Sequence, residues 1–236
     1  MKRHRLGQHY LVDQEVIHRV LSLADIKPTE RILEIGTGKG ALTRELVRLG
    51  ASYVGYEIDR QNYEETTKAV RGTGARIMHA NAFAQTPEFD VLVSSLPYSQ
   101  SATFVRWLST LRFKRAVVLL QEDFVGKISL PPGSRDYRGV SALSQICFKI
   151  RVLGKVGRAA FSPQPRVGSV IASFEPKRQI TKEEGLNISR LFSLRRRLAD
   201  SALAELGMMQ GASFGRRRVY MLSPEEVHSV CSPRPQ

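Results

Sequence analysis

Short apolar runs alternate with stretches of helical periodicity along the first 120 residues of the chain. Residues 13–24 carry apolar side chains at the spacing of an amphipathic helix, with Asp13 placed as its N-cap. Each short apolar run that follows predicts a buried strand. These strands are expected at residues 31–35, 53–57, 75–79, 91–94 and 116–120.

Helical spacing fills the intervals between these predicted strands. The helices are expected at residues 41–49, 60–70 and 101–111. The inward positions of the first of them are expected to be Leu42, Leu46, Val47 and Leu49. Strands that alternate with helices at this spacing predict an α/β fold, with a parallel sheet and helices on both of its faces.

The pattern changes in the second half of the chain. Residues 140–150 have helical spacing, and residues 170–174 form an apolar run typical of a late strand. After Pro176 the pattern is purely helical and strongly basic. We therefore predict an α/β domain at residues 1–176 and a small basic helical domain at residues 177–236.

The charge balance points to an anionic partner. The chain has 36 Lys and Arg against 22 Asp and Glu, a formal net charge of +14. Residues 151–236 alone hold 15 basic and 7 acidic residues, including the runs Arg195-Arg196-Arg197 and Arg216-Arg217-Arg218. Nucleic acid is favoured because the planar fork of Arg suits phosphate. A membrane surface is disfavoured because neither run lies on a strongly amphipathic helix with aromatic anchors.

Other classes of protein are excluded by what the composition lacks. No apolar run approaches the roughly 18 residues of a membrane span, and the first ten residues lack the apolar region of a signal peptide. We therefore expect a cytoplasmic protein. With only Cys147 and Cys231, and five histidines in no metal-binding spacing, neither a disulfide framework nor a metal site is expected.

A glycine-rich turn between a strand and a helix indicates a nucleotide cofactor. The segment Gly36-Thr37-Gly38-Lys39-Gly40 allows a tight bend and close approach of the backbone to a ligand. Glu57 ends the next predicted strand, where a carboxylate can accept both hydroxyls of an adenosine ribose. Because Gly36, Gly38 and Ala41 also satisfy the dinucleotide pattern, these two features alone leave a nicotinamide dehydrogenase open.

The loop Ser95-Leu96-Pro97-Tyr98 follows the fourth predicted strand, at the sheet edge where such folds bind ligands. A short polar residue, a proline and an aromatic ring match the loop of amino-group methyltransferases. An amine conjugated to a base is a poor nucleophile because its lone pair is delocalised. Acceptors on Ser95 and on the Leu96 carbonyl can hold its protons and turn the lone pair toward a methyl donor. Tyr98 can stack on a base that has left the helix.

With these residues in place, the chain resembles the ribosomal RNA adenine N6-dimethyltransferases of the kasugamycin-resistance type, in their archaeal form. The resemblance runs nearly end to end. It is carried by residues 6–13 (LGQHYLVD), 34–38 (EIGTG), Glu57, 79–82 (HANA), 96–98 (LPY), 121–122 (QE), 137–141 (YRGVS), 161–169 (FSPQPRVGS) and 192–198 (FSLRRRL). The resemblance implies a Rossmann-like methyltransferase fold with S-adenosylmethionine as the cofactor.

Site residues also follow from the resemblance. The implied cofactor contacts are Gln8, His9, Leu11, Gly36, Gly38, Glu57, Asn81 and Ser95. His9 and Leu11 would contact the methionine portion, and Asn81 the adenine. The implied catalytic positions are Ser95, Leu96, Pro97, Tyr98 and Phe161, with Phe161 facing the target adenine opposite Tyr98. No metal is implied.

The implied reaction methylates N6 of two adjacent adenines near the 3′ end of small-subunit (16S) ribosomal RNA, during ribosome biogenesis. The partner is the assembling small subunit, and a monomer is expected. For RNA contact we expect Arg195, Arg196, Arg197, Arg216, Arg217 and Arg218, with Lys2, Arg3 and Arg5 of the N-terminal segment.

Two positions depart from the family pattern. Ser95 stands where the family has Asn, and Asn81 stands where it has Asp. The region beyond Pro176 is also short for the family. These departures keep two alternatives open: a weak or inactive RNA-binding assembly factor on the same fold, and a large-subunit ribosomal RNA adenine methyltransferase.

Overall fold

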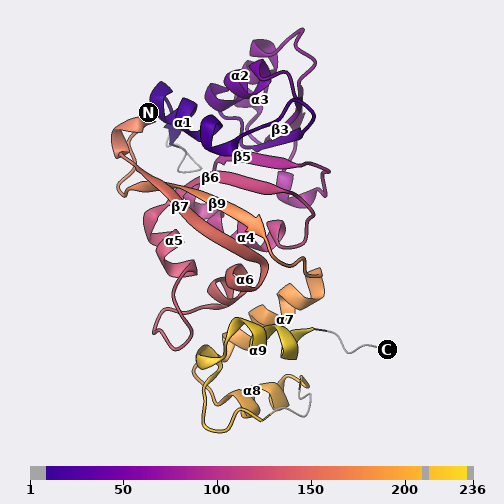
Figure 1. Ribbon diagram of the computed structural model, residues 1–236, viewed down its shortest axis with the longest axis vertical. Helices are drawn as coiled ribbons and strands as arrows, with labels where there is room; N and C mark the ends of the chain where they lie inside the picture. The colour runs from indigo at the N-terminus through magenta and orange to yellow at the C-terminus, as the bar shows by residue number, and fades with distance from the viewer. Residues whose placement is uncertain (1–8, 209–212, 233–236) are drawn as a thin grey trace.

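The structure is a computed structural model that describes residues 9–208 and 213–232. Its centre is a seven-stranded sheet of order β4-β3-β2-β5-β6-β9-β7 (Figure 1). The five strands expected from the apolar runs are all present and pair in parallel: β2 (Arg31–Ile35), β3 (Ser52–Glu57), β4 (Arg76–His79), β5 (Val91–Ser95) and β6 (Arg115–Gln121).

The expectation of a parallel sheet is wrong for its last two strands. β9 (Ser169–Pro176) pairs antiparallel with β6, and β7 (Phe148–Val156) pairs antiparallel with β9. No crossover helix separates β7 from β9, and only an antiparallel partner can be reached without one. A separate two-stranded pair joins β1 (Tyr10–Leu11) to β8 (Phe161–Ser162).

The helix expected at residues 140–150 ends earlier than predicted. α6 spans Gly139–Cys147, and the chain enters β7 at Phe148. Lys149 and Arg151 then lie on the same side of β7, where both form ion pairs with Glu175 of β9. β7 therefore begins within residues 140–150, where the apolar spacing predicts a helix.

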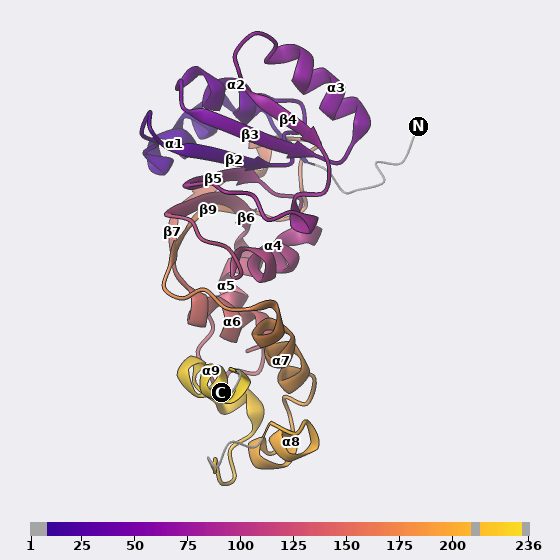
Figure 2. The same ribbon diagram turned by 90° about the vertical axis from the view of Figure 1, so that its right-hand side faces the viewer.

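Helices cover both faces of the sheet, as predicted (Figure 2). α1 (Gln14–Ala24) and α2 (Ala41–Arg48) pack on one face, while α4 (Ser101–Leu108) and α6 pack on the other. The remaining helices of this part are α3 (Arg60–Ala69) and α5 (Glu122–Ile128). Leu49 does not point inward: it caps the end of α2 and is 41% exposed. Val47 is only partly buried.

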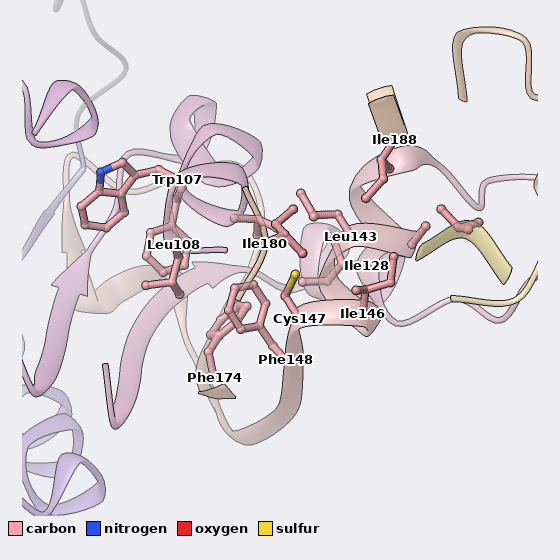
Figure 3. Close-up of a cluster of buried hydrophobic side chains, with 14 of the residues drawn as sticks. Trp107, Leu108, Ile128, Leu143, Ile146, Cys147, Phe148, Phe174, Ile180 and Ile188 are labelled. Atoms are coloured by element: carbon pink, nitrogen blue, oxygen red, sulfur yellow. The ribbon is translucent and has the colours of Figure 1, made fainter. Parts of the chain in front are cut away.

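Beyond Pro176 the chain is helical, as expected: α7 (Lys182–Ser193), α8 (Ala199–Glu205) and α9 (Pro224–Cys231). α7 and α9 pack against α6, and the buried cluster runs from the sheet through α4 and α6 into these helices (Figure 3). β9 ends at Pro176, the predicted domain boundary, but apolar packing continues past it. The division of the chain at that residue stays a prediction.

No helix in the part of the chain that the structure describes is long and apolar enough to cross a membrane.

Candidate active site

The glycine turn lies between β2 and α2 and is built by backbone geometry that glycine allows. Gly36, Gly38 and Gly40 all have positive φ, at 71°, 53° and 75°, a conformation that other residues adopt only with strain. The turn is held to β3, because the Gly36 amide donates to the Tyr56 carbonyl at 2.8 Å. A Cβ on Gly38 would lie 3.1 Å from the Tyr10 ring. The turn therefore brings bare backbone to the edge of a cavity.

Glu57 ends β3 beside this turn, and its carboxylate is held by backbone amides. Its Oε2 accepts from Gly38 N, and its Oε1 accepts from Ile58 N and Asp59 N, all at 2.8 Å. The residue is 4% exposed. A carboxylate has about four lone-pair sites, so three amides fix its orientation and leave capacity for a hydroxyl donor. Glu57 is thus a rigid acceptor at the position the sequence predicted.

A second carboxylate, Glu34, lies on β2 beneath the turn and was given no role by sequence reasoning. Its Oε2 accepts from the hydroxyls of Thr43 at 2.8 Å and Tyr53 at 2.6 Å. Burial raises the pKa of Glu34 to about 8, although both hydroxyls oppose the shift. Glu34 therefore joins β2, α2 and β3 through a buried polar network under the glycine turn.

Asn81 lies after β4, at the start of a short 3₁₀ turn (Ala82–Ala84). Its Oδ1 accepts from the Phe83 amide at 3.0 Å, which caps that turn. The side-chain carbonyl is thus engaged within the protein, and the NH₂ group is the part left for another partner. An aspartate in this position would have a second oxygen free.

The loop that follows β5 is pinned on both sides of Ser95. The hydroxyl of Ser94 donates to the Ile35 carbonyl of β2 at 2.6 Å. Leu96 is buried, and Pro97 leads into a 3₁₀ turn (Tyr98–Gln100). Ser95 itself borders the cavity and, among the described residues, its hydroxyl has no hydrogen-bond partner within the protein.

Tyr98 lies between Ser169 and His9 at the other end of this loop. Its phenolic oxygen shares a 2.6 Å hydrogen bond with the hydroxyl of Ser169 on β9. Partial burial raises the pKa of Tyr98. The His9 ring lies 5.6 Å from the Tyr98 ring, and its Nδ1 donates to the Pro163 carbonyl at 2.7 Å. Tyr98 thus lines the cavity with its hydroxyl already bonded to Ser169.

One cavity of about 190 Å³ joins these elements at the carboxyl ends of β2, β3 and β5. Predicted site residues that line it are His9, Gly36, Gly38, Glu57, Asn81, Ser95, Leu96, Pro97, Tyr98 and Phe161. Leu11 lies instead in an adjoining smaller cavity and pairs with Phe161 across β1 and β8. Gln8 lies outside the described residues. The sequence motifs thus converge on one site, whose residues also include Tyr10, Ile58, Phe83 and Gln100.

The two predicted arginine runs lie among the C-terminal helices, on the part of the molecule away from α1, α2 and α3 (Figure 1). They do not line the cavity. Arg197 forms an ion pair with Glu205, and Arg217 forms a two-pronged ion pair with Glu226 at 2.6 and 3.0 Å. Lys2, Arg3 and Arg5 lie outside the described residues. Groups of His, Cys, Asp or Glu able to hold a metal ion are absent from residues 9–208 and 213–232.

The sheet, the glycine turn, the held carboxylate and the Ser-Leu-Pro-Tyr loop define a Rossmann-like protein with a nucleoside-cofactor site beside an aromatic pocket. The chain belongs to the ribosomal RNA adenine dimethylase family, which it matches over residues 1–222.

Relatives and solved structures agree with this family. A probable ribosomal RNA small subunit methyltransferase A from Thermococcus sibiricus is 33% identical over 244 residues, covering 95% of this chain and 89% of the relative. Ribosomal RNA small subunit methyltransferase A from Thermotoga neapolitana is 32% identical over 235 residues, covering 96% and 89%. A crystal structure of a dimethyladenosine transferase from Plasmodium falciparum has a TM-score of 0.76 at 23% identity, covering 94% and 96%. The 23S rRNA methyltransferase ErmE has a TM-score of 0.62 at 21% identity, covering 94% and 99%. The expected methyltransferase fold is confirmed.

Proposed function

We propose that this protein transfers methyl groups from S-adenosylmethionine to the N6 amines of two adjacent adenines near the 3′ end of small-subunit ribosomal RNA, during ribosome biogenesis. The observation that carries the proposal is the meeting of Glu57, Ser95 and Tyr98 in one cavity. Membership of the ribosomal RNA adenine dimethylase family supports the reaction, and the names of the relatives support the small subunit as substrate.

The residues around the cavity fit the cofactor. Glu57 has acceptor capacity left for ribose hydroxyls, and the glycine turn leaves room for the methionine portion beside it. The buried hydroxyl of Thr37 in this turn has no hydrogen-bond partner among the described residues, as expected for a group that meets a ligand. Asn81 and Ile58 flank the place for the adenine. When bound, the cofactor supplies an electrophilic methyl group.

Ser95 and the Leu96 carbonyl are the groups that orient the target amine. Both can accept its N–H hydrogens, and holding them turns the nitrogen lone pair out of conjugation with the base. The amine becomes acidic as it is alkylated, so no strong base is needed before the methyl group moves, and the proton is lost to water after the transfer. Ser95 is free to accept from the amine because its hydroxyl is not engaged within the described protein.

Tyr98 and Phe161 position the flipped adenine. Both line the cavity, and base–aromatic stacking stabilises an unstacked base by about 1–3 kcal/mol. The hydroxyl bond to Ser169 and the neighbouring ring of His9 hold Tyr98 in place. The pocket therefore holds the base without contacts that identify the surrounding sequence, which other parts of the protein must read.

We propose that the arginine-rich C-terminal helices supply RNA contact, and that the protein acts as a cytoplasmic monomer.

The test is to incubate the purified protein with labelled S-adenosylmethionine and small ribosomal subunits that lack the modification. We expect dimethylated adenine in the 3′ hairpin, identified by mass spectrometry of nuclease digests. Glu57→Ala and Tyr98→Ala variants should lose the label, while Arg48→Ala, on the exposed face of α2, should retain it.

The same experiment separates the alternatives. An RNA-binding assembly factor without activity would bind subunits and leave the adenines unmodified, an outcome motivated by Ser95 and Asn81. A large-subunit enzyme would leave the small subunits unlabelled and would label 23S RNA in a parallel incubation with large subunits. Either result would overturn the proposed reaction.

A further inference from the structure

One polar side chain that lines the cavity has no part in the proposed reaction and no partner within the described protein. Gln100 ends the turn Tyr98–Gln100 and directly precedes α4. Its backbone amide donates to the Pro97 carbonyl at 2.9 Å, which fixes the turn. Its side-chain amide makes no hydrogen bond to the described residues and does not cap α4. This carboxamide is therefore available for a ligand.

The turn that carries Gln100 connects two sides of the cavity. At its start, the hydroxyl of Tyr98 is bonded to Ser169 of β9, on the side proposed for the target base. At its end the chain enters α4, and α4 packs against the 3₁₀ turn that Asn81 caps. Phe83 of that 3₁₀ turn lines the same cavity. Gln100 thus lies on the Asn81 side, where the adenine of the cofactor is placed.

The adenine of S-adenosylmethionine carries an exocyclic amine, which needs a hydrogen-bond acceptor. Asn81 does not offer a free one, because its Oδ1 already accepts from the Phe83 amide at 3.0 Å and the group left over is the NH₂. Two donors would then face each other. A donor that loses water on binding and finds no acceptor lowers the affinity for the ligand.

The side chain of Gln100 supplies the acceptor that Asn81 lacks. A glutamine carboxamide presents an acceptor oxygen and a donor nitrogen side by side, and adenine matches this pair with its amine and an adjacent ring nitrogen. Both groups of Gln100 are unused within the described protein. The carboxamide therefore fits adenine chemically as well as by its place in the cavity.

We infer that Gln100 recognises the adenine of the methyl donor, with its Oε1 accepting a hydrogen of the exocyclic amine. In this role Gln100 takes the place of the aspartate that the family has at the position of Asn81. The inference rests on the proposed function for the identity of the cofactor. Gln100 determines specificity for the nucleoside and takes no part in methyl transfer. The departure at Asn81 is thus compensated inside the cavity, and cofactor binding is kept.

The test measures the binding of two nucleosides by calorimetric titration without RNA. The first is S-adenosylhomocysteine, and the second is its purine analogue, in which hydrogen replaces the exocyclic amine. The wild type should bind S-adenosylhomocysteine about fivefold more tightly than the analogue, the factor expected for one hydrogen bond. Gln100→Leu should bind the analogue as the wild type does and lose this preference. Gln61→Leu makes the same change on the exposed face of α3 and should retain the preference.

A rescue experiment ties the effect to the missing acceptor. The double variant Asn81→Asp/Gln100→Leu should regain the preference for S-adenosylhomocysteine, because aspartate can cap the 3₁₀ turn with one oxygen and accept from the adenine amine with the other. A general loosening of the cavity in Gln100→Leu would not be repaired in this way. Failure of the rescue would therefore contradict the inference.

Three further outcomes would overturn the inference. The first is a preference for S-adenosylhomocysteine that persists in Gln100→Leu. The second is unchanged cofactor binding together with a raised KM for RNA, which would assign Gln100 to the target adenine. The third is loss of both nucleosides by Gln100→Leu and by the smaller Gln100→Ala, which would assign it a structural role. A wild type that bound neither nucleoside would refute the methyl donor of the proposed function and the inference together.

Discussion

The phenolic oxygen of Tyr98 lies 2.6 Å from the hydroxyl of Ser169. Ser169 is buried and sits in β9 between Gln121 of β6 and Val156 of β7, so its position is fixed by two neighbouring strands. The Tyr98 ring is therefore anchored to the antiparallel strands of the sheet. The sequence pattern predicts β9 as a late strand but misses β7, which pairs with it.

Replacing Ser169 with Ala should lower turnover by about fivefold, because one hydrogen bond contributes about 1 kcal/mol and its loss lets the Tyr98 ring move. Cofactor affinity should not change, since Ser169 does not line the cavity. Single-turnover methylation and calorimetric titration of the cofactor would measure the two effects. A double-mutant cycle with Tyr98→Phe isolates the bond: additive losses would contradict the anchoring role.

The hydroxyl oxygen of Ser95 should be required for full methylation activity, because it accepts a hydrogen bond from the target amine. Ser95→Ala removes the acceptor and should lower kcat by a factor of ten to a hundred, with little change in RNA affinity. Ser95→Asn restores the family residue and should keep or raise kcat, because an amide carbonyl accepts without competing as a donor. The ratio of monomethylated to dimethylated adenine, read by mass spectrometry, reports the second transfer. Full activity of Ser95→Ala would exclude a role for the side chain.

Asn81→Asp should tighten cofactor binding by up to about tenfold, a gain on the order of 1 kcal/mol. In Asn81 the carbonyl oxygen caps the turn at Phe83 and the NH₂ group is left over. Aspartate can cap the turn with one oxygen and accept from the adenine amine with the other. Titration with S-adenosylhomocysteine measures the change, and Asn81→Ala should weaken binding. Weaker binding by the Asp variant would show that the NH₂ group, not an acceptor, serves the ligand.

Glu34 should make stability depend on pH. Its pKa is raised to about 8 in the folded protein and is near 4.5 when unfolded, so the folded state retains a proton that the unfolded state loses. The free energy of unfolding should therefore decrease as pH rises from about 4.5 to 8, by up to about 1.4 kcal/mol per pH unit. Glu34→Gln accepts the same two hydroxyl donors without titrating. Urea unfolding at pH 5, 6.5 and 8 should show a flatter profile for this variant; parallel profiles would contradict the shift.

Local pattern was enough to predict the parallel strands, their helices, the glycine turn, Glu57 and the Ser-Leu-Pro-Tyr loop, because each signal lies within a few consecutive residues. The cavity residues His9, Asn81 and Phe161 followed only from the resemblance to the family. The glycine turn, Glu57 and the Ser-Leu-Pro-Tyr loop end neighbouring parallel strands, so the topology brings them together. β7 was missed because its first residues continue an apolar helix pattern and only pairing with β9 makes them a strand. The two-residue strands β1 and β8 are too short to leave a pattern.

Interactions between distant segments could not be predicted in the same way. The six arginines of the two runs look equivalent in the sequence. In the structure two of them, Arg197 and Arg217, form ion pairs with Glu205 and Glu226. The loop between α5 and α6 also reaches this region, where the Arg135 carbonyl accepts from Arg195, sixty residues away in sequence. Glu34 and Ser169 lie in motifs that are visible in the sequence. Only the structure shows that their hydrogen-bond partners are Tyr53 and Tyr98.

The buried cluster that continues from the sheet into α7 and α9 has a consequence for how this protein can change. Ile180, Ile188 and Leu191 lie in the same cluster as Phe174 of β9 and Ile146 of α6 (Figure 3). Cutting the chain at Pro176 would expose this apolar surface to water. The C-terminal helices therefore cannot be removed or exchanged as an independent module. Adaptation to a different RNA has to proceed by single substitutions on the outside, with the interior left as it is.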